Sequence, residues 1–178
     1  MKNKIIIAAM TATILMVGCG KETSSRRSSL ALPPEQASAA SAATPVSQPT
    51  LAAWQQGEIA AAVSSFVSAD WSARPLFAAD SALSLSEGQF KALSDTDRQA
   101  RHGEIMAQLE SFKRLAAAVA QAGRDAAVNG DTAAARNDFI ALKACGTALE
   151  SPKCLTLVQM VGQALKKRAD MELAKISQ

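Results

Sequence analysis

The sequence predicts an all-α fold: a small antiparallel bundle of about four main helices, preceded by a disordered tether. Apolar residues recur at helical steps of three and four through the second half of the chain. Helix caps and helix stops separate these periodic segments. The apolar residues are dominated by alanine, with no tyrosine, five phenylalanines and two tryptophans, and alanine favours closely packed helices.

The N-terminus has the layout of an export signal. Lys2 and Lys4 precede an apolar stretch from Ile5 to Val17. That stretch is shorter than the ~20 apolar residues that span a bilayer. We therefore expect residues 1–18 to be a signal peptide rather than a membrane anchor.

A cysteine closes this stretch, in the segment Leu15-Met16-Val17-Gly18-Cys19-Gly20. The segment resembles the lipobox of bacterial lipoproteins. The resemblance implies cleavage before Cys19 and attachment to a membrane through acyl chains, such as palmitate, on that residue. Gly20 in place of Asp implies sorting to the outer membrane, facing the periplasm. The alternatives are an ordinary secretory signal and an uncleaved N-terminal anchor.

Residues 19–50 are predicted to form a disordered linker, because they are rich in Ser, Ala and Pro and poor in large apolar side chains. Loss of Lys2 and Lys4 with the signal peptide lowers the formal charge from +3 to +1. A nearly neutral chain gives no reason to expect a nucleic-acid partner.

The helical domain is predicted to span residues 51–178. Its first helix covers residues 51–69, with an apolar stripe of Leu51, Trp54, Ile59, Val63, Phe66 and Val67. Ser86 and Gln89 have the spacing of a capping box and indicate a short helix. Trp71 and Phe77, in the irregular stretch between these helices, are expected in the core, with contact to a partner as the alternative.

A long helix is predicted from Ser94 to Val128, with acidic residues at its positive N-terminal end. Its apolar seam consists of Ile105, Leu109, Phe112, Ala116 and Val119. Asn129-Gly130 is expected to end this helix, and Asp131 to cap the next one. That helix is predicted over residues 132–149. Its apolar stripe consists of Ala135, Phe139, Leu142, Gly146 and Leu149. Ser151-Pro152 is expected to begin a last helix, with Leu155, Val158, Val161, Leu165 and Met171 on one side.

Residues 119–142 faintly resemble the helix-turn-helix unit of tetratricopeptide repeats, in Ala122-Gly123, Ala126, Gly130-Asp131, Ala135 and Phe139. The preceding helix is about twice too long for that repeat, and no second copy follows. We therefore expect a plain helical hairpin, in which Gly123 and Ala126 allow close helix contact.

Cys145 and Cys154 are expected to lie about one turn to either side of the hairpin bend near Glu150. Facing positions in an antiparallel hairpin and an oxidising location predict a disulfide between them. A redox or metal site is the alternative, although the spacing is not C-x-x-C and no histidine lies nearby.

No catalytic, cofactor-binding or metal-binding motif is found. His102, the one histidine, lies in a polar stretch and is expected on the surface. Lys166-Lys167-Arg168 is interpreted as a solvated face, with contact to anionic lipid as the alternative.

We therefore expect a non-catalytic binding or scaffolding module of the cell envelope, which uses no cofactor and offers a helical groove to another envelope protein. The alternatives are an enzyme or small-ligand-binding protein with a cryptic site, and a structural lipoprotein that self-associates through the seam at residues 105–119.

Overall fold

The structure, a computed structural model, describes residues 44–177, which belong to one compact unit of the chain. The predicted signal peptide, Cys19 and most of the predicted tether lie outside these residues. The described part is all-helical, as predicted, and contains no strand. Its elements are α1 (Gln48–Gln55), α2 (Ile59–Ser68), the short 3₁₀ helix η1 (Ala82–Ser84), α3 (Glu87–Lys91), α4 (Asp95–Val128), α5 (Thr132–Leu149) and α6 (Thr156–Ile176).

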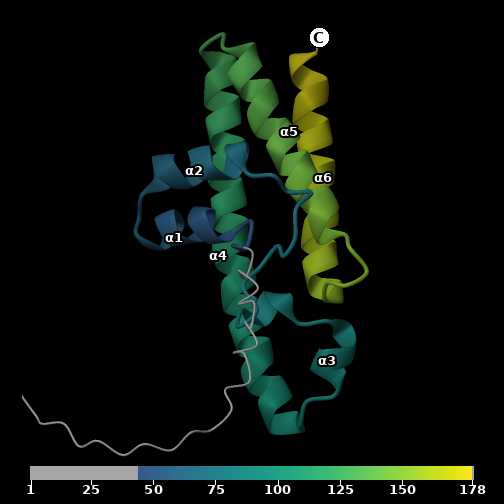
Figure 1. The fold of residues 1–178 in the computed structure, drawn as a ribbon. Helices are drawn as coiled ribbons and strands as arrows, with labels where there is room; N and C mark the ends of the chain where they lie inside the picture. Colours follow the sequence, from purple (N-terminus) through teal and green to yellow (C-terminus); the bar gives the residue numbers. More distant parts are fainter. Residues whose placement is uncertain (1–43, 178) are drawn as a thin grey trace, which may run out of the picture. The chain divides into compact units, whose positions relative to one another are not determined.

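The long helix α4 is the main structural element of the bundle. Both of its predicted ends are confirmed. The Ser94 hydroxyl accepts a hydrogen bond from the Asp97 amide at 3.1 Å, which caps the first turn. At the other end, Gly130 adopts a positive φ of 83° and lets the chain reverse into α5. Figure 1 shows α1 and α2 side by side across α4, and α5 and α6 running alongside its C-terminal half.

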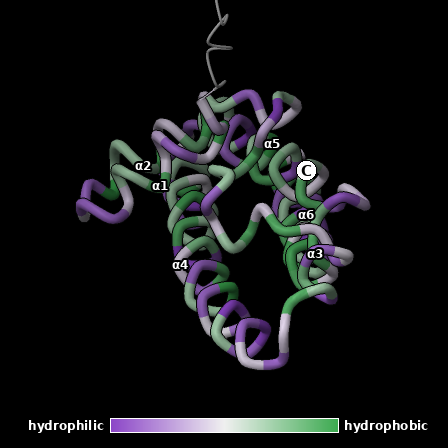
Figure 2. Tube along the Cα trace, turned by 60° about the horizontal axis from the view of Figure 1, so that its bottom comes forward, coloured by the Kyte–Doolittle hydropathy of each residue, from purple (hydrophilic) through white to green (hydrophobic). Residues whose placement is uncertain are grey.

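The predicted seam of α4 is buried within the chain. All five of its residues are at most 5% exposed. The five residues predicted for the stripe of α5 are also buried, as is Val158 on α6. In Figure 2, hydrophobic (green) and hydrophilic (purple) residues alternate along α4, which is the pattern of a helix with one apolar face and one polar face. Because the seam is covered by the chain's own helices, it does not present the free surface that the alternative of self-association through residues 105–119 would use.

The single helix predicted over residues 51–69 is wrong, because the chain forms two helices there. Gly57 has a positive φ of 77°, and it reverses the chain between α1 and α2. The apolar stripe therefore belongs to two separate helices, and Ile59 is left 56% exposed at the start of α2.

The folded unit also begins earlier than residue 51. The Val46 and Ser47 amides donate to the carbonyls of Pro75 and Leu76 at 3.0 and 3.1 Å, and Ser47 and Thr50 are buried. Pro49 lies in the first turn of α1, where its missing amide hydrogen costs nothing. The linker was predicted to extend to residue 50 because the segment is rich in Ser and Pro. Residues 48–50 instead form the start of α1.

Trp71 and Phe77 lie in the core, as predicted. Their rings gather with that of Phe66 around Phe112, whose centroid lies 6.1 to 6.5 Å from the other three. The indole nitrogen of Trp71 donates to the Phe66 carbonyl at 3.0 Å, which satisfies its one buried polar atom. This aromatic cluster fixes the irregular segment 69–81 against α2 and α4.

The last helix begins at Thr156 rather than at Ser151-Pro152. Residues 151–154 form a turn, in which the Cys154 amide donates to the Ser151 carbonyl at 2.9 Å, with Pro152 at the second position. Proline at this position is compatible with a turn as well as with the start of a helix, and here the chain forms the turn. Met171, predicted on the packed side of α6, is instead 52% exposed.

The predicted disulfide is absent from the structure, in which Cys145 and Cys154 are both free thiols. Cys145 is buried in α5, but Cys154 lies in the turn before α6 and not within a helix. The two cysteines therefore do not occupy the facing helical positions on which the prediction rested.

A carboxylate from α3 caps the N-terminus of α6. Glu87 accepts from the Thr156 amide and hydroxyl, both at 3.3 Å, and the capping box of Ser86 and Gln89 fixes α3 itself. The bond from the Thr156 amide is the main reason why the pKa of Glu87 is lowered from its ordinary value of 4.5, with a further contribution from Lys91.

This cap predicts a pH dependence. A lowered folded-state pKa means that the stabilisation is complete above the ordinary pKa and is lost as pH falls through the folded value. Glu87→Gln should therefore unfold at lower urea concentration than the wild type at about pH 6, and the gap should close towards about pH 3. A gap that stays constant over this range would show that the charge of Glu87 does not contribute.

Candidate functional site

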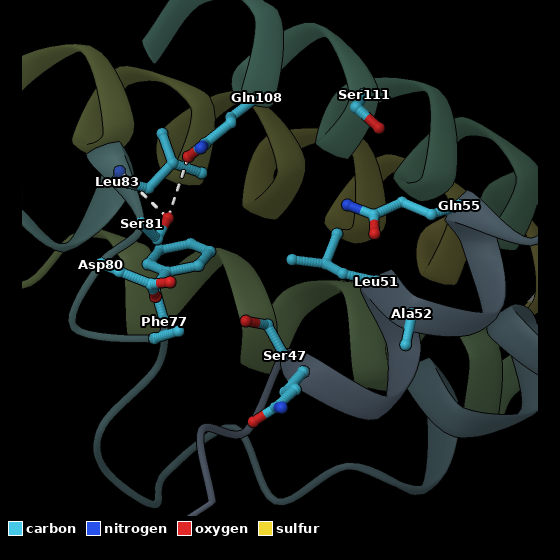
Figure 3. Close-up of a pocket in the computed structure, with 12 residues that line it drawn as sticks. Ser47, Leu51, Ala52, Gln55, Phe77, Asp80, Ser81, Leu83, Gln108 and Ser111 are labelled. Carbon is cyan, nitrogen blue, oxygen red and sulfur yellow. Dashed lines mark hydrogen bonds between the residues drawn. The ribbon is translucent and has the colours of Figure 1, made fainter. Parts of the chain in front are cut away.

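A cleft opens between α1, the segment 77–83 and the middle of α4 (Figure 3). Its volume is about 420 Å³, within the range of pockets that hold small ligands or parts of larger ones. Leu51, Phe77 and Leu83 form its apolar floor. Polar side chains surround this floor: Ser47, Gln48, Gln55, Asp80, Ser81, Gln108 and Ser111.

Hydrogen bonds hold the walls of the cleft in place. The Ser47 hydroxyl donates to the Leu76 carbonyl at 2.6 Å and ties the start of α1 to the segment before Phe77. The Ser81 hydroxyl accepts from the Leu83 amide at 3.2 Å, which caps η1, and donates to the Gln108 amide oxygen on α4 at 2.9 Å. The cleft is thus built into the fold rather than left between loosely packed elements.

Other polar groups of the cleft have no partner. Among residues 44–177, the side chains of Gln48, Gln55 and Ser111 make no hydrogen bond with the protein, whereas Ser47, Ser81 and Gln108 do. In Figure 3, Gln55 on α1 lies just above Leu51, and Ser111 on α4 lies higher in the same view. These groups can donate to and accept from a bound molecule without breaking a bond within the protein.

Neutral polar and apolar side chains make up most of the lining of the cleft. Asp80 is its one ionisable side chain, and no cysteine, histidine, lysine or arginine lines it. The serine hydroxyls of the lining have no histidine or lysine among the lining residues to act as their base. The cleft also has no cation with which to hold a phosphate or carboxylate group.

The residues singled out from the sequence lie elsewhere. His102 is exposed on α4, and Cys145 and Cys154 lie near the bend between α5 and α6. Burial raises the pKa of the Cys145 thiol well above its ordinary value; burial also raises that of Cys154, with Arg74 opposing the shift. Raised thiol pKa values are unsuited to nucleophilic or redox chemistry. Within residues 44–177, no group of three or more His, Cys, Asp or Glu side chains is placed to hold a metal ion.

Sequence reasoning missed this cleft because α1 was assigned in part to the tether. The available signal was the placing of glutamines and serines next to core positions, as in Gln108 beside Leu109 and Ser111 beside Phe112.

A second depression lies between α2, α4 and α5. It is larger, about 850 Å³, and mainly apolar, with Ile59, Val63 and Val67 on one wall and Ala122 on another. Asp138 lies at its edge, where burial and the nearby Asp131 raise the pKa of its carboxyl group. It offers fewer hydrogen-bonding groups than the cleft beside α1, so it would bind a ligand with less specificity.

Comparisons with known protein families, with curated proteins and with solved structures find no match to this chain. None of the helices between residues 44 and 177 combines the length and apolar character needed to cross a membrane.

Proposed function

We propose that this protein is a lipid-anchored, non-catalytic binding module of the bacterial cell envelope, which uses the cleft between α1 and α4 to hold a segment of another envelope protein. The observation that carries the binding role is the set of neutral polar groups in the cleft that have no partner within residues 44–177. The lipobox-like segment around Cys19 supports the anchor and favours the outer membrane, with the bundle facing the periplasm.

An extended peptide segment fits the lining of the cleft better than other ligands do. Glutamine amides offer a donor and an acceptor together, which matches the alternating N–H and C=O groups of a peptide backbone. A sugar would need an exposed aromatic face on which to stack, but Phe77 is 5% exposed. An anionic ligand would meet Asp80 and no cation.

The experiment is site-specific photo-cross-linking in intact cells. A photoreactive residue at Gln55, which lines the cleft, should form an adduct with one envelope protein, through a peptide segment of that partner. The matched control places the same residue at the neighbouring Gln56, which is exposed and does not line the cleft. It should give no adduct.

A second variant tests whether the cleft itself is occupied. Ser111→Trp fills the cleft from the α4 side, so it should abolish the adduct at Gln55, provided that its thermal unfolding shows an intact fold. Equal adducts at Gln55 and Gln56, or an adduct that survives Ser111→Trp, would contradict binding in this cleft.

A further inference from the structure

The outer face of α6 breaks the usual pattern of a surface helix. One side of α6 packs against α5 through Val158, Gly162, Leu165 and Ala169. The opposite side, where polar residues are expected, carries apolar ones. Leu157, Met160 and Met171 are 39%, 60% and 52% exposed, and they share a helix face with the exposed Ala164.

Two cations without partners lie on or beside this stripe. Lys167 falls between Ala164 and Met171 at helical spacing, and Arg168 follows it. Neither makes an ion pair with any residue in 44–177, although every other cation of α6 does: Lys166 with Glu150 and Lys175 with Glu172.

The carboxylates of α6 are already neutralised. Asp170 pairs with Lys143 at 2.7 Å, and Glu172 pairs with Arg124 at 3.4 Å as well as with Lys175. The helix contains no other acidic residue. The unpaired charge on α6 is therefore entirely positive.

We propose that this α6 face, made of Leu157, Met160, Ala164, Lys167, Arg168 and Met171, docks onto an anionic lipid surface. Apolar side chains flanked by lysine and arginine are the pattern of helices that lie in a membrane interface. Negatively charged headgroups would complement Lys167 and Arg168, while the methionines and Leu157 enter the boundary of the acyl chains. A second copy fits this face less well, because a symmetrical pair aligned on Met160 and Met171 brings the like charges of both chains together near its centre.

The docking rests in part on the anchor proposed at Cys19, since two cations and a short apolar stripe bind weakly from solution. Acyl chains would keep the bundle close to the membrane and raise the effective concentration of the α6 face there.

Oxidative footprinting of the methionines in the full chain tests this docking. The intact mass is recorded first, so that failure of the anchor is recognised separately. The protein is then placed with phosphatidylcholine vesicles that contain phosphatidylglycerol, or with phosphatidylcholine alone. Met160 and Met171 should oxidise about fivefold or more slowly with the anionic vesicles. Met106 on α4, which is 46% exposed, serves as the internal control and should change little.

The double variant Lys167→Glu/Arg168→Glu should remove the protection of Met160 and Met171, and so should high salt, because both weaken attraction to the headgroups. Equal oxidation with both vesicle types would overturn the proposal. Protection that appears without vesicles and grows with protein concentration would also overturn it, because the occupant would then be a second copy of the chain.

Discussion

Replacing Gly162 by Ala should lower the free energy of unfolding by about 1 to 3 kcal/mol, despite the better helix propensity of alanine. The crossing of α5 and α6 is made by two glycines whose backbones touch. A Cβ at Gly162 would lie 2.6 Å from the Gly146 carbonyl oxygen and 3.1 Å from the Glu150 amide nitrogen. Backbone atoms cannot swing aside as side chains do, so the two helices must separate.

Gly103→Ala is the matched control for this prediction. Gly103 also lies inside a helix, α4, but a Cβ there meets nothing within 4 Å. This variant should gain roughly 0.5 to 1 kcal/mol from propensity alone. Urea unfolding of both variants, followed by circular dichroism, gives the comparison. A stabilised Gly162→Ala protein would mean that α5 and α6 do not cross at these glycines.

Phe112→Ala should cost about 3 to 5 kcal/mol, the larger of the two effects, because Phe112 is 1% exposed and contributes the central ring of the aromatic cluster. Its loss removes packing for α2 through Phe66 and for the segment 69–81 through Trp71 and Phe77. Because Phe77 forms part of the cleft floor, the variant should also loosen the candidate binding site.

Phe90→Ala removes the same ring from a half-buried position after the capping box, outside the cluster. It should cost clearly less than Phe112→Ala, about 1 to 2 kcal/mol. Tryptophan fluorescence adds a local readout, since the Trp71 ring packs against that of Phe112 at 6.5 Å and should become more solvated only in Phe112→Ala. Equal losses in the two variants would argue against a core centred on Phe112.

The sequence was informative where local chemistry and apolar periodicity agree. Ser94, the Ser86–Gln89 capping box and Asp131 cap helices as predicted, because a capping side chain needs only its own neighbours along the chain. The buried seam of α4 was readable because five positions repeat at helical spacing over four turns.

The wrong helix predictions arose at residue types that are compatible with two different local structures. Gly57 reverses the chain inside an apolar stripe that reads as continuous, and Pro152 forms a turn where it was expected to open a helix. The Gly162 contact and the cap from Glu87 to Thr156 join segments that are distant in sequence, so neither leaves a local pattern. The cleft was missed for a similar reason, since its walls come from residues 47–55, 77–83 and 108–111.

The central claim, a binding module held to a membrane through Cys19, is tested most directly by the intact mass of the protein extracted from its native membrane. The protein is denatured and alkylated without reduction before the measurement. We expect a chain that begins at Cys19, heavier than residues 19–178 by its acyl chains and carrying two alkyl groups on the free thiols of Cys145 and Cys154. If Cys145 and Cys154 were alkylated only after reduction, the predicted disulfide between them would be present, and the anchor at Cys19 would not be affected by that result. A chain that starts elsewhere, or that begins at Cys19 without acyl chains, would contradict the account.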